Sequence, residues 1–96
     1  MDATQPIVVR IAGRVTQADV PHLCEELRAR LSGVAGGAEA ICDVGALTHA
    51  NLTAVDALAR LQLTARRLGC RIRLRNAGAE LRLLLDLVGL ADLAPP

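Results

Sequence analysis

Hydrophobic and polar residues repeat along this chain with two different periods, and each period predicts one kind of element. Short β-rich runs occupy residues 7–12 and 40–44, and a strictly alternating run occupies residues 70–75. Between and after these runs, leucine, valine and alanine recur at helical spacing. The predicted order is strand, helix, strand, helix, strand, helix, which favours an α/β fold with right-handed crossovers between parallel strands.

Start and stop signals mark the predicted helices. Thr16 and Asp19 have the spacing of a capping box, and the alternative is that Asp19 is itself the cap. Pro21 falls in a first helical turn, where its missing N–H costs nothing. Gly69 and Gly89 are the predicted stops of the second and third helices. The apolar residues at helical spacing predict three buried stripes: Val20, Leu23, Cys24, Leu27 and Leu31; Ala54, Leu58, Leu61, Ala65 and Leu68; Leu81, Leu84, Leu85 and Val88, with Leu90 and Leu93 beneath the last helix.

The alternating run at residues 70–75 also indicates how the sheet is covered. Ile72 and Leu74 point to one face, whereas Arg71, Arg73 and Arg75 point to the other. A parallel strand covered on both faces would be apolar on both. We therefore expect one domain, residues 1–96, with a small, mostly parallel β-sheet and helices packed mainly on one face.

Composition argues against several classes of function. Hydrophobic residues make up 52% of the chain, which excludes intrinsic disorder. A net charge of +1 and the absence of aromatic residues disfavour nucleic-acid binding. All eleven basic residues are arginine, so no lysine is present for a Walker A loop or Schiff-base chemistry.

Cysteine and histidine usage predicts neither a metal site nor a secreted protein. The three cysteines are widely spaced, with no CxxC pair, and only two histidines are present, so the spacing of a zinc site is missing. An odd number of cysteines without a secretory signal fits a reducing cytoplasm. No apolar run reaches the roughly 18 residues of a transmembrane helix. We expect a cytoplasmic protein with no cofactor, no metal and no direct membrane insertion.

The second half of the chain shows a characteristic order of landmarks. A strand ends in Asp43, and a loop leads to Asn51-Leu52-Thr53 at a helix start; a break at Gly69, another strand, Asn76 and a final helix follow. This order resembles the STAS domain, best known from bacterial anti-sigma factor antagonists. The short chain is also similar to the small STAS subunit of bacterial phospholipid-transport ABC systems.

This resemblance implies a non-catalytic domain that binds proteins. As an anti-sigma factor antagonist in transcription regulation, it would bind an anti-sigma factor with an ATPase-like kinase fold and so free a sigma factor. As the alternative, a small STAS subunit would dock on the ATPase of a lipid-transport ABC system. The partner-binding surface would comprise the loop, the helix start and nearby parts of the first helix: Thr48, His49, Asn51, Leu52, Thr53 and Asp56.

Thr53 matches the phosphoacceptor position of the STAS switch. A phosphate there would add about −1.5 to −2 charges at a helix N-terminus, where an anion is favoured. Three departures make the motif degenerate: Asn51 replaces the usual Asp, Leu52 replaces a small polar residue, and Ala54 replaces Gly. Asn51 favours the alternative interpretation, in which Thr53 is an ordinary cap or first-turn residue.

Other side chains near this motif also admit two interpretations. Leu52 is either an apolar knob on the docking surface or a residue buried against the preceding loop. Asp43 is expected to organise the loop by accepting backbone N–H bonds, since no base or nucleophile at a supporting spacing favours a catalytic role. For His49, a solvated or capping role is favoured over a pH sensor. The arginine row at 71, 73 and 75 is interpreted as a solvated face, with an acidic partner as the alternative.

Overall fold

The computed structural model of this chain describes residues 7–34 and 36–94. The ends of the predicted domain, residues 1–6 and 95–96, lie outside this part. The elements follow the predicted α/β order: β1 (Ile7–Arg10), α1 (Val20–Leu31), β2 (Glu39–Asp43), α2 (Leu52–Arg67), β3 (Arg71–Arg75) and α3 (Ala79–Leu87), with short 3-10 turns η1 (Gln17–Asp19) before α1 and η2 (Ala91–Leu93) after α3.

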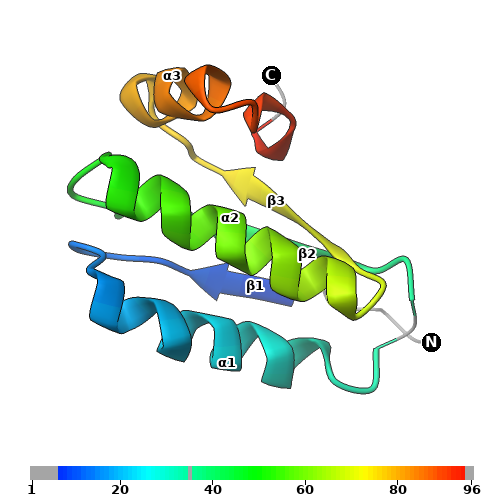
Figure 1. Cartoon of the computed structure of the whole chain (residues 1–96). Helices are drawn as coiled ribbons and strands as arrows, with labels where there is room; N and C mark the ends of the chain where they lie inside the picture. Colours follow the sequence, from blue (N-terminus) through cyan, green and yellow to red (C-terminus); the bar gives the residue numbers. More distant parts are fainter. Residues whose placement is uncertain (1–6, 35, 95–96) are drawn as a thin grey trace.

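The three strands form a parallel sheet in the order β1-β2-β3. Parallel neighbours need a crossover connection, and α1 and α2 supply the two crossovers. Figure 1 shows α1 and α2 side by side along the sheet, with α3 beyond the β3 edge and on the far side of α2 from α1. This arrangement confirms the predicted fold class.

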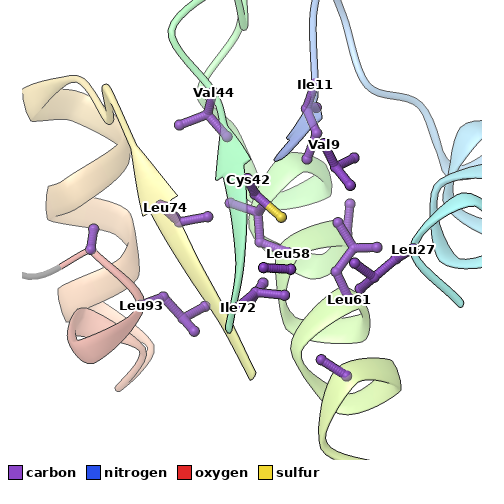
Figure 2. Packing of buried hydrophobic residues seen from close by; sticks show 14 of the residues in the cluster. Val9, Ile11, Leu27, Cys42, Val44, Leu58, Leu61, Ile72, Leu74 and Leu93 are labelled. Atoms are coloured by element: carbon purple, nitrogen blue, oxygen red, sulfur yellow. The ribbon is translucent and has the colours of Figure 1, made fainter. Parts of the chain in front are cut away.

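One hydrophobic core lies between the sheet and its helices (Figure 2). Val9, Cys42 and Leu74 are partners in register across the three strands, so they project from the same face. Helices and η2 cover this face with fully or almost fully buried leucines: Leu27, Leu58, Leu61, Leu85 and Leu93. On the opposite face, Ile41 is half-buried and the arginine row of β3 is exposed.

Two of the predicted buried positions are wrong. Leu68 is 39% exposed and Val88 is 48% exposed. Each is the residue that follows the last turn of its helix, at the C-cap. The apolar stripe stops facing the core once the helix ends, so periodicity overestimates burial at this position. Leu84 and Leu90, by contrast, are half-buried and pack against the core.

The two candidate caps before α1 begin two successive elements. The backbone N–H of Thr16 donates to Asp19 Oδ2 at 2.8 Å, and this capping box begins the 3-10 turn η1. Asp19, the alternative cap, occupies the N-cap position of α1, which begins at Val20. Pro21 then lies in the first turn of α1, as predicted.

Candidate functional site

The predicted site residues lie at the edge of the sheet where its parallel strands end. Residues 45–51, here called the 45–51 loop, leave the end of β2 and lead into α2. Two backbone hydrogen bonds fasten this loop to the segment that follows β1. Gly13 donates its N–H to the Ala46 carbonyl at 3.0 Å, and Thr48 donates its N–H to the Gly13 carbonyl at 3.0 Å. The loop is therefore held by two of the three strands.

Asp43 ties the loop to the third strand. Its Oδ1 accepts the backbone N–H of Gly45 at 2.9 Å and the Asn76 side-chain amide at 3.2 Å. Its Oδ2 accepts the Arg75 guanidinium at 3.2 Å. The Gly45 bond first, then the Asn76 and Arg75 bonds, hold the pKa of Asp43 below its usual value. These bonds suit an ionised carboxylate that organises the loop, the role predicted for it.

Gly45 and Asn76 are two members of this cluster that the sequence analysis missed. A Cβ on Gly45 would lie 3.0 Å from Asn76 Cβ and 3.2 Å from Asp43 Oδ1, so a larger residue here would require these side chains to shift by a few tenths of an ångström. Asn76 has a φ of 63°, in the left-handed region that asparagine tolerates better than most residues. The Asp-x-Gly spacing is a turn signal that points to Gly45; no local signal pairs Asn76 with Asp43.

Asn51 caps α2. Its backbone is extended, and its Oδ1 accepts the N–H of Ala54 at 2.9 Å. Thr53 is the second residue of the helix, so the cap role is taken by Asn51 and not by Thr53. Thr53 is half-buried. Its position in the first turn places its hydroxyl where the partial positive charge of the helix is greatest.

Leu52 is a large apolar residue exposed at this edge. It is the first residue of α2 and is 65% exposed, so the alternative in which it packs against the loop is wrong. In the preceding loop, Thr48 and His49 are exposed and share a contact of 3.0 Å between Thr48 Oγ1 and His49 Nδ1. The 45–51 loop and the start of α2 therefore present one large exposed apolar side chain together with exposed polar ones.

A shallow groove extends this surface onto the start of α1. One wall holds Asp56 and Arg60 of α2, whose side chains pair at 2.9 Å. The other wall is formed by Gln17, Val20 and Pro21. The groove thus joins Asp56 and Arg60 of α2 to the start of α1 in a single surface.

Within residues 7–34 and 36–94, no group of three or more His, Cys, Asp or Glu side chains could hold a metal ion. Burial raises the pKa of the Cys42 thiol to about 12, which keeps it in the unreactive neutral form. None of the described helices is both long and apolar enough to span a bilayer.

Fold and site together define a small parallel α/β module with one exposed loop-and-helix surface. A family model described as "Mlab, STAS domain" matches residues 2–95, and the chain therefore belongs to the STAS domain family. STAS domains generally mediate protein–protein interactions and are generally non-catalytic. Comparison with curated proteins finds no match.

Proposed function

We propose that this chain is a cytoplasmic, non-catalytic protein-binding domain that acts as an anti-sigma factor antagonist. Its partner in this role is an anti-sigma factor with an ATPase-like kinase fold. The observation that carries the proposal is the exposure of Leu52 on the surface formed by the 45–51 loop and the first turn of α2. A large apolar side chain ringed by polar residues is the usual form of a binding anchor.

The exposed area of the Leu52 side chain sets its expected contribution to the binding free energy. Full burial of a leucine side chain stabilises a complex by about 1.5–3 kcal/mol. Leu52 is 65% exposed in the free protein. A partner pocket that buries this exposed part of the side chain therefore stabilises the complex by about 1–2 kcal/mol. Thr48, His49, Asn51 and Asp56 would form the polar rim, which contributes more to specificity than to affinity.

A phosphate on Thr53 would act as the switch in this proposal. It would place about −1.5 to −2 charges next to Leu52. The Asn51 side chain already accepts the Ala54 N–H, so the phosphate would have only the remaining first-turn donors. Docking would weaken because the anchor would have to enter an apolar pocket beside an added dianion.

The alternative function is docking on the ATPase of a lipid-transport ABC system. The match to the Mlab family model over residues 2–95 favours it, together with the degenerate switch motif. Such docking would use the same surface and would not require Thr53 to be phosphorylated.

The test begins with the partner. The tagged protein is captured from its native cytoplasm and the bound proteins are identified by mass spectrometry, with the phosphorylation state of Thr53 read in the same experiment. An anti-sigma factor of the kinase fold supports the first function, and a transporter ATPase supports the second.

Calorimetric titration with the purified partner then tests the surface. Leu52→Ala is expected to weaken binding roughly tenfold, since 1.4 kcal/mol corresponds to a factor of ten. Leu63→Ala is the matched control, because Leu63 is an exposed leucine (51%) further along the same helix. Thr53→Glu should weaken binding while Thr53→Val should not. Unchanged affinity in Leu52→Ala would contradict the proposed surface.

A further inference from the structure

A second apolar surface lies on α3, away from the α2 helix start. Leu81 and Leu85 of α3 are buried in the core, 3% and 0% exposed. On the opposite side, Leu83 is 60% exposed and Leu87 is 71% exposed, and the two are one turn apart. α3 therefore carries apolar residues on its exposed side as well as on its buried side. Here α3 lies at the margin of the fold, and only its inner side is covered (Figure 1).

Charged residues on α3 indicate what covers this stripe. Arg82 and Asp86 are also one turn apart, and helical geometry places both on the same flank of the Leu83–Leu87 stripe. Neither side chain forms an ion pair or hydrogen bond with another residue of the described part of the chain. The flank therefore offers one positive and one negative charge at helical spacing, both available to a partner.

We propose that α3 is a self-association surface that pairs with α3 of a second copy, antiparallel and across a two-fold axis. In an antiparallel pair of helices, equivalent flanks meet each other. Arg82 then faces Asp86 of the second copy, and the reciprocal pair forms by symmetry. The Leu83–Leu87 stripe of one α3 packs against the same stripe of the other α3. In a parallel two-fold pair, equivalent flanks lie on opposite sides of the interface, so Arg82 of one copy and Asp86 of the other would not meet.

The same features distinguish a second copy from a membrane surface. Glu80 and Asp86 border the stripe, and carboxylates at this position are repelled by anionic lipid. The two leucines on a helix of nine residues, about 13 Å long, provide far less than the roughly 800 Å² per partner of a standard interface. The expected dimer is therefore weak and depends on concentration.

Analytical ultracentrifugation of the full chain, from about 10 μM to about 1 mM, tests this proposal. The average mass should rise with concentration from the monomer value of 10.1 kDa towards the dimer value. Arg82→Asp and Asp86→Arg should each weaken association roughly tenfold, because both symmetric pairs change from attractive to repulsive. The double variant, R82D with D86R, should restore association to near the original level.

Two leucine variants complete the experiment, with circular dichroism as the check on folding. Leu87→Ser should abolish association, whereas Leu63→Ser, at an exposed leucine of α2, should leave it unchanged. A monomer at every concentration would overturn the proposal. So would a loss of association in Leu63→Ser equal to that in Leu87→Ser, or a double charge variant no better than the single ones.

Discussion

Two leucines of α2 provide a direct test of the core. The Leu61 side chain is 0% exposed and lies in the core between its own helix, α1 and the sheet (Figure 2). Leu63, two residues further on, is 51% exposed. Replacing each by alanine removes the same atoms from the same helix. Helix propensity changes equally in both variants, so any difference between them reports burial.

The expected magnitudes differ severalfold. Leu61→Ala removes a fully buried side chain and leaves a cavity, which costs about 2–5 kcal/mol. The whole domain, at 0.05–0.15 kcal/mol per residue over 96 residues, has about 5–14 kcal/mol of unfolding free energy. Leu63→Ala should change stability by less than about 0.5 kcal/mol. The loss at Leu61 corresponds to a fall in Tm of at least about 8 °C.

The assay is urea unfolding followed by far-ultraviolet circular dichroism, because the chain has no tryptophan or tyrosine for fluorescence. The m-value should be the same for the wild type and both variants if the transitions are two-state. A loss below about 1 kcal/mol in Leu61→Ala, or an equal loss in Leu63→Ala, would show that the described core packing is wrong.

Three further predictions follow from the hydrogen bonds and burial described above. Asn51→Ala should cost about 1 kcal/mol in urea unfolding and Asn51→Ser much less, since serine also caps; equal losses would contradict the cap. Asp43 has a lowered pKa in the folded state, so it stabilises the fold above its unfolded pKa of about 3.9, and this stability is lost as pH falls through the lower folded value. The wild type should therefore lose more stability than Asp43→Asn in titrations below about pH 4, and parallel curves would refute the linkage. A thiol reagent should label half-buried Cys24 in the native protein and leave buried Cys42 unlabelled until urea is added; rapid native labelling of Cys42 would contradict its burial.

Local patterns were sufficient to predict the elements and how the sheet is covered. Alternation at residues 70–75 predicted both β3 and its exposed arginine face, because side chains on a strand alternate between two faces. The amide of Asn51 and the apolar run after it predicted the start of α2, because a cap acts within three residues. The same reasoning wrongly predicted that Leu68 and Val88 are buried, because the hydrophobic period does not show at which residue each helix ends.

The candidate site depended on contacts that no local pattern contains. Asp43 and Asn76 are 33 residues apart, and they meet only because the parallel register of β2 and β3 brings Asp43 opposite Arg75. The exposure of Leu52 and Leu87 likewise depends on which neighbouring element covers each helix. Sequence alone determined the order and type of the elements, because those depend on short-range sterics and periodicity. Tertiary structure decided the exposure of the apolar residues that periodicity does not resolve, such as Leu52 and Leu87, because that exposure depends on packing between segments distant in the chain.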